Sequence, residues 1–190
     1  EEAQRKLLAT QKPQAAVVKE VAADGKIKTI KTNPQEAVLA LKNREEILAE
    51  SKNLRLPVES ESLHGSISLK GARFDDLTLA KYFETQENKK EVVLFAPAQS
   101  KDRYFADFGW LSSNGALDLP NPNTIWKSDV AKLTPKTPVT LSWTNKQNIE
   151  FKIKITLDEN YMFKVSQAVK NNSKTEISVA SYGRINRTMN

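Results

Sequence analysis

The sequence predicts an all-β fold, a twisted antiparallel β-sandwich, for the part of the chain that begins near residue 54. Three observations predict it. From that point onward, apolar and polar residues alternate with a period of two. Turn residues recur roughly every ten to twelve residues, which is the spacing of a sandwich or barrel. The chain has 190 residues, 39% of them hydrophobic, which is enough for one core with a polar extension.

The first part of the chain, residues 1–53, is interpreted as a linker. Ala, Lys, Gln and Glu dominate its first 32 residues, and a transient helix is expected before Pro13. Asn33 and Pro34 mark a boundary, and the apolar stripe after them predicts a partly helical segment within 34–52. The chain opens without methionine or a signal-peptide pattern, so we expect it to be a fragment of a longer protein.

The strands are predicted from alternation and from the turns between them. The predicted strand segments are 66–70, 76–80, 92–95, 139–144, 151–157, 163–169 and 177–179. The clearest is 151–157, where every second residue is apolar and the residues between them are lysine or threonine. Residues 112–138 hold four prolines, which predicts a long surface excursion.

Composition excludes several kinds of chemistry. The chain has no cysteine, which excludes disulfides, thiolate metal sites and cysteine nucleophiles. No apolar run approaches the ~18 residues that a membrane-spanning helix needs. The net charge of +6 fits a solvated basic surface, and it also leaves open an anionic lipid surface or an acidic partner. Nucleic acid is not an expected partner, because lysines and arginines do not cluster among aromatic residues.

His64 is the only histidine, and Asp75 and Asp76 form an adjacent acid pair beyond it. A histidine ligand or base needs partners, so we interpret His64 as a half-exposed residue at a strand start. Neighbours in an extended strand point to opposite faces, so the two carboxylates are not expected to share one substrate atom. We expect one of the two aspartates to shape a bend near Arg73. Arg73 is the expected ion-pair partner of either acid. We predict no catalytic and no metal-binding residue.

Aromatic residues suggest a binding surface. Tyr104, Phe108, Trp110 and Trp126 are the candidate residues for contact with a partner or a ligand in a cleft. Aromatic residues also fill the cores of sandwiches, and that alternative stays open.

Several motifs resemble one protein family. Residues 63–77, LHGSISLKGARFDDL, resemble the first strands of the large periplasmic domain in the YidC family of bacterial membrane protein insertases. Later motifs of that domain resemble residues 95–98, 104–110, 122–126, 133–135 and 158–163, in the same order. The resemblance runs from about residue 54 to the end of the chain.

The resemblance implies a non-catalytic periplasmic domain of a bacterial inner-membrane protein, with a mutarotase-like supersandwich fold and no cofactor. In this family a transmembrane helix precedes the linker, here residues 1–53, and insertase activity belongs to a membrane core that this chain lacks. The domain, residues 54–190, would support insertion and folding of inner-membrane proteins by docking to the Sec translocon and its accessory membrane subunits. Nascent inner-membrane proteins would be partners of the missing core.

Two expectations remain open. The family's domain continues past residue 190, so we expect a truncated sandwich that self-associates, or a smaller complete sheet unit. The alternative function is a carbohydrate-binding or mutarotase-like sugar-active sandwich. Mutarotase chemistry needs an acid and a base that face one pocket, and a single histidine at the start of a strand meets this requirement poorly.

Overall fold

A computed structural model gives the fold of most of the chain. It describes residues 16–21, 27–32, 42–87, 89–113 and 115–188. The chain divides into two compact units, Glu1–Lys42 and Asn43–Asn190. Among the described residues, no helix is long and apolar enough to cross a membrane.

The first unit contains an antiparallel hairpin that the linker interpretation does not include. Strands β1 (Ala16–Val21) and β2 (Ile27–Thr32) pair with Ala16 opposite Thr32. The missed signal is Asp24-Gly25, a turn dipeptide between two runs rich in β-branched residues. The helix expected before Pro13 lies outside the described residues.

The second unit begins with the short helix α3 (Arg44–Glu50), which falls inside the predicted helical segment. Asn43 accepts a hydrogen bond from the backbone N–H of Glu46, and the Glu46 carboxylate accepts one from the Asn43 backbone N–H. This capping box starts the helix, and Ile47 is its buried residue. Residues 34–41 of the predicted segment lie outside the described residues. A 3₁₀ turn, η1 (Lys52–Leu54), then leads into the first strand of the sandwich.

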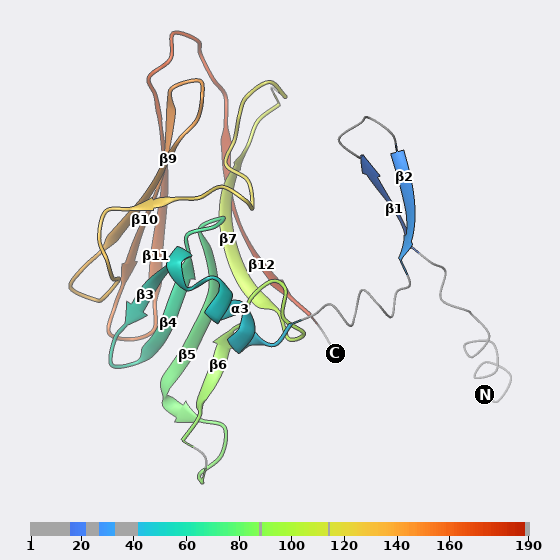
Figure 1. The fold of residues 1–190 in the computed structure, drawn as a ribbon. Helices are drawn as coiled ribbons and strands as arrows, with labels where there is room; N and C mark the ends of the chain where they lie inside the picture. The colour runs from blue at the N-terminus through green and yellow to red at the C-terminus, as the bar shows by residue number, and fades with distance from the viewer. Residues whose placement is uncertain (1–15, 22–26, 33–41, 88, 114, 189–190) are drawn as a thin grey trace, which may run out of the picture. The chain divides into compact units, whose positions relative to one another are not determined.

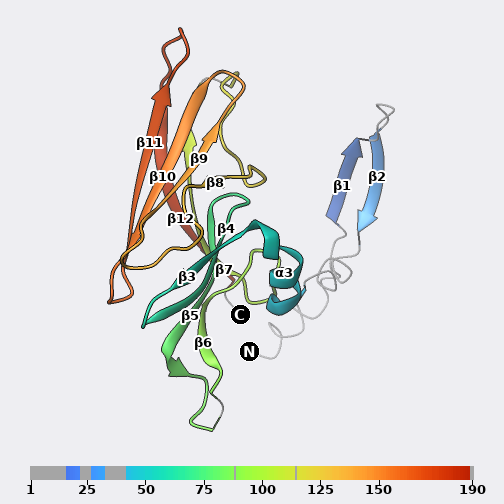
Figure 2. The same ribbon diagram turned by 60° about the vertical axis from the view of Figure 1, so that its left-hand side comes forward.

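Two antiparallel sheets form the rest of the unit (Figures 1 and 2), which confirms the predicted all-β sandwich. The larger sheet has the strand order β12-β7-β5-β4-β3, and β6 also pairs with β5. Its strands are β3 (Arg55–Glu59), β4 (Leu63–Ser68), β5 (Arg73–Phe83), β6 (Glu91–Phe95), β7 (Tyr104–Leu111) and β12 (Ala180–Arg187). The smaller sheet has the order β11-β10-β9-β8. Its strands are β8 (Lys127–Ser128), β9 (Val139–Thr144), β10 (Ile149–Leu157) and β11 (Phe163–Asn171).

The core lies between the two sheets. Strand β10 alternates as predicted, with Phe151, Ile153 and Ile155 fully buried and the lysines between them directed outward. The Phe151 ring meets Trp110 of β7 edge-on, with centroids 5.1 Å apart. Phe163 of β11 meets Phe74 of β5 in the same way, at 5.2 Å. These contacts join the two sheets into one core.

The segment 112–138 is largely irregular, as predicted, and includes only the two-residue strand β8. It nevertheless contributes Leu117, Trp126 and Leu133 to the core, so this segment packs against the sandwich. The strand predicted at 177–179 is wrong by a few residues, since β12 begins at Ala180.

Candidate functional site

The four aromatic residues predicted to bind a partner occupy two different environments. Trp110 and Trp126 are 4% and 2% exposed, and their rings stack with centroids 6.2 Å apart. The core interpretation therefore holds for both tryptophans. Tyr104 and Phe108 are half-buried on β7. Binding through these two residues stays a prediction.

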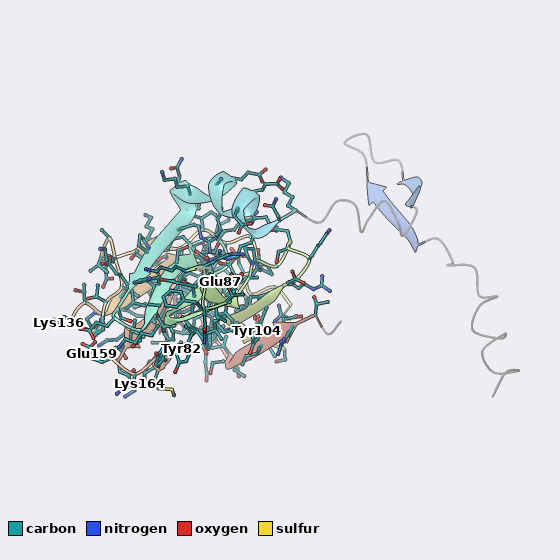
Figure 3. All side chains as sticks on the ribbon, turned by 90° about the horizontal axis from the view of Figure 1, so that it is seen from below. Tyr82, Glu87, Tyr104, Lys136, Glu159 and Lys164 are labelled. Carbon is teal, nitrogen blue, oxygen red and sulfur yellow. The ribbon has the colours of Figure 1, made fainter. Side chains whose placement is uncertain are left out.

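Tyr104 is the first residue of β7, an inner strand of the larger sheet between β12 and β5, and is labelled in Figure 3. Its ring meets Phe95 edge-on at 4.9 Å, and the Arg187 guanidinium lies 5.0 Å from its centroid. Phe108 meets Phe74 at 5.5 Å. Both rings are therefore held by neighbouring strands.

A shallow pocket lies beside the Trp126 ring. It is lined by Gly71, Asp107, Phe108, Pro120, Asn121, Pro122, Trp126 and Tyr182. The space inside it is about 10 Å³, which corresponds to about one water molecule. Small-molecule sites usually offer roughly 300 Å³ or more. This pocket is therefore too small for a sugar ring.

His64 lies on β4 with its side chain 48% exposed, as the sequence predicts. Its Nδ1 is 2.8 Å from Oε1 of Glu91 on β6. The hydroxyl of Thr78 on β5 donates to Oε2 of the same carboxylate at 2.5 Å. The other acceptor within reach of the Thr78 hydroxyl is the backbone oxygen of His64, at 3.3 Å, and not its ring. The imidazole therefore does not activate this hydroxyl as a nucleophile. The cluster connects three strands.

The hydrogen bond from Thr78, with the smaller contribution of His64, lowers the pKa of Glu91 below its ordinary value of 4.5, although partial burial opposes this. A carboxyl group with a lowered pKa in the folded state contributes stability that is complete above pH 4.5. That contribution is lost as the pH falls through the lower value of the folded state.

We therefore expect Glu91→Gln to be less stable than the wild type at pH 7, and the difference to shrink toward zero under acidic conditions. Urea unfolding at a series of pH values from 7 to 3 measures it. Thr78→Val, which removes the main cause of the lowered pKa, should show the same pH dependence. A difference between wild type and Glu91→Gln that stays constant over this range would contradict the assignment.

The acid pair lies at a β-bulge that sequence analysis missed. Ser66 of β4 is opposite Asp76 and Ile67 is opposite Phe74, so Asp75 is an extra residue in β5. The expected alternation of faces is broken here. Both aspartates are buried, at 5% exposure each. Burial raises the pKa of Asp75, and the charge of Asp76 adds a smaller rise.

Gly65 is the sequence signal that could have indicated the bulge. Its φ is +136°, and a Cβ at this position would lie 2.1 Å from the backbone oxygen of Asp76. Only glycine allows the two strands to approach this closely.

Each aspartate is paired with a different arginine. Arg55 at the start of β3 pairs with Asp75, and Arg44 of α3 pairs with Asp76. The Ser66 hydroxyl connects the pairs, since it donates to Asp76 Oδ2 at 2.5 Å and accepts from Arg55 Nε at 2.7 Å. We call Arg44, Arg55, Ser66, Asp75 and Asp76 the Arg–Asp cluster.

Arg73, the expected partner of the acids, lies elsewhere. Its guanidinium is 5.1 Å from the centroid of the Phe105 ring, and no ion pair joins it to an acid among the described residues. The prediction of an Arg73 ion pair is wrong, because the bulge turns the carboxylates toward α3 and β3.

Burial raises the pKa of Asp75 above its ordinary value of 3.8, while the charge and hydrogen bond of Arg55 oppose the rise. Both carboxylates are occupied by arginines, so neither is available as an acid or base for a substrate. The Arg–Asp cluster instead attaches α3 to the larger sheet.

The described residues define an antiparallel β-sandwich domain whose titratable clusters connect its own elements. Within the described ranges, no group of three or more His, Asp or Glu side chains could hold a metal ion. A family model for the YidC periplasmic domain matches residues 55–190. The chain therefore belongs to the family of YidC periplasmic domains, as its motifs predict, which places it in the periplasm as a domain of an inner-membrane protein.

Similar proteins agree with this assignment. The chain is 52% identical over 134 residues to the membrane protein insertase YidC of Rickettsia bellii, which covers 70% of this chain and 24% of that protein. It is 50% identical over 139 residues to the protein of the same name from Rickettsia rickettsii, covering 73% and 25%. The chain thus spans about a quarter of the length of the curated relatives it matches.

Proposed function

We propose that this chain is a non-catalytic docking domain of a membrane protein insertase. Its partners are the Sec translocon and its accessory membrane subunits, and the whole protein's clients are nascent inner-membrane proteins. The family assignment supports the first part, because the relatives it matches are named as membrane protein insertases. The proposal includes self-association of this chain through the exposed edge of β12, which is also the proposed docking surface.

The observation that carries the proposal is the open edge at β12. This strand ends the order of the larger sheet, and in the part of the chain that the structure describes no strand pairs with its outer edge. Ile185 on β12 is 69% exposed, which is unusual for an isoleucine. An exposed strand edge can receive an extended segment of a partner through backbone hydrogen bonds.

A pull-down tests the docking proposal. The full 190-residue chain is immobilised and incubated with solubilised inner membranes, and retained Sec subunits are quantified by mass spectrometry. We expect the wild type to retain them and Ile185→Asp to retain at least about tenfold less, because a charge on the edge blocks strand addition. Circular dichroism confirms that the variant is folded.

Met162→Asp is the matched control, since Met162 is 66% exposed and lies outside β12, in the turn after β10. It should retain Sec subunits as the wild type does. Retention that is absent in the wild type, or equal in wild type and Ile185→Asp, would overturn the proposal.

A further inference from the structure

The outward face of the smaller sheet is strongly basic. Residues on β10 that alternate with the core residues are Glu150, Lys152, Lys154 and Thr156. The other strands add Lys127 from β8 and Lys164 and Lys170 from β11. Strand β9 carries no charged residue. Five lysines face one glutamate across four strands, a net charge of +4, and we call this surface the lysine face.

The register places these lysines on one side of the sheet. Lys152 lies opposite Ser142 of β9 and Ala168 of β11, and Lys127 of β8 is opposite the same serine. Lys164 is opposite Thr156, and Figure 3 shows it at the periphery of the domain. The residues between the lysines are mostly threonine and serine.

Most of these lysines lack an acidic partner. Glu150 pairs with Lys152 at 3.0 Å. Among the described residues, Lys127, Lys154, Lys164 and Lys170 have no carboxylate within 4.0 Å. The nearby Asp129 carboxylate accepts a hydrogen bond from the Thr140 backbone N–H.

The exposed face of the larger sheet differs, although it also carries lysines. Lys81 of β5 lies 3.8 Å from Glu61, and Lys132, in the irregular segment beside β3, pairs with Glu59 of β3 at 2.5 Å. What distinguishes the smaller sheet is that four lysines without a carboxylate within 4.0 Å lie together on one of its faces.

The chemistry of the lysine face fits a lipid surface better than a protein. Protein interfaces are depleted in lysine and depend on buried aromatic or arginine residues, which this face does not present. Dispersed lysines separated by small hydroxyl residues suit a laterally mobile array of phosphate groups. We propose that the lysine face binds the anionic phospholipid headgroups of a bilayer. This rests on the proposed function, in which the domain belongs to a membrane protein.

Vesicle co-sedimentation tests this inference without any Sec component. The full 190-residue chain is mixed with vesicles of phosphatidylglycerol and phosphatidylcholine, or of phosphatidylcholine alone. We expect binding only to the anionic vesicles, and its loss in 0.5 M salt, where screening is strong. Each lysine near an anionic surface contributes about fivefold in affinity, so replacing four should weaken binding by about 600-fold.

The test variant changes the four lysines without acidic partners to glutamine: Lys127→Gln, Lys154→Gln, Lys164→Gln and Lys170→Gln. The matched control removes the same charge from exposed lysines outside the four strands: Lys52→Gln, Lys70→Gln, Lys89→Gln and Lys101→Gln. The control should keep most of the binding, and both variants should unfold at the temperature of the wild type.

Equal loss in the two variants would overturn the lysine face as the site, because only net charge would then matter. No preference of the wild type for anionic vesicles would overturn the lipid assignment. Binding to polyglutamate without binding to anionic vesicles would also overturn it, and would identify an acidic protein segment as the ligand. A negative vesicle result with Sec subunits retained in the pull-down would leave the docking proposal standing.

Discussion

Replacing Arg55 with methionine is expected to lower the free energy of unfolding by about 3–5 kcal/mol. The substitution removes the ion-pair partner of this buried carboxylate, Asp75, and leaves only the weaker charge interaction with Arg73 to oppose its burial. It also removes the donor to Ser66 Oγ. Equilibrium unfolding in urea, analysed by linear extrapolation, measures the loss.

The pH dependence of this variant gives a second readout. Burial already raises the pKa of Asp75, and in Arg55→Met the charge and hydrogen bond of Arg55 no longer oppose this rise. A carboxyl group with a raised pKa destabilises the fold only at pH values at which it is charged. The loss in free energy of unfolding caused by Arg55→Met should therefore shrink as the pH falls.

A double variant separates the lost pair from lost packing. Arg55→Met combined with Asp75→Leu removes both charges, and replacing a buried pair with apolar residues is often neutral. We expect it to recover most of the stability lost by the single variant. Arg103→Met, at an exposed arginine just before β7, should change stability by less than about 0.5 kcal/mol. A loss below about 1 kcal/mol for Arg55→Met would contradict the role of the Arg–Asp cluster.

The sequence predicts strands well where one face of the strand is buried and the other is exposed to solvent. Strand β10 is the clearest case, since its burial alternates at every residue. Strand β7 was not predicted because neighbouring residues such as Phe105 and Ala106 are both buried, so no alternation is visible. Strand β12 is exposed along nearly its whole length and gives no apolar period either.

The Arg–Asp cluster could not be derived from spacing along the chain. Arg55 and Asp75 are 20 residues apart, and Arg44 and Asp76 are 32 apart. The pairing of β3, β4 and β5 brings Arg55 to Asp75, the position of α3 brings Arg44 to Asp76, and the bulge at Asp75 decides where the carboxylates point. The lysine face was visible in the sequence as alternation, but its net charge emerges only when the register aligns four strands.

The second large effect is expected at the contact between the two sheets. Phe151→Ala should lower the free energy of unfolding by about 3–5 kcal/mol, because it opens a cavity in a fully buried site. The Phe151 ring lies between Trp143 of its own sheet, at 5.8 Å, and Trp110 of the other. Urea unfolding followed by tryptophan fluorescence measures the loss and reports on the same contact.

Phe83→Ala is the matched control, because it deletes the same side chain at a position that is 48% exposed at the end of β5. Its cost should be less than about 1 kcal/mol, since little apolar surface is buried there. The comparison tests whether the two sheets share one core. If they do, fluorescence and far-UV circular dichroism should report one coincident transition in both variants. Two separate transitions, or a similar small loss in both variants, would mean that the sheets are stabilised independently and that Phe151 does not join them.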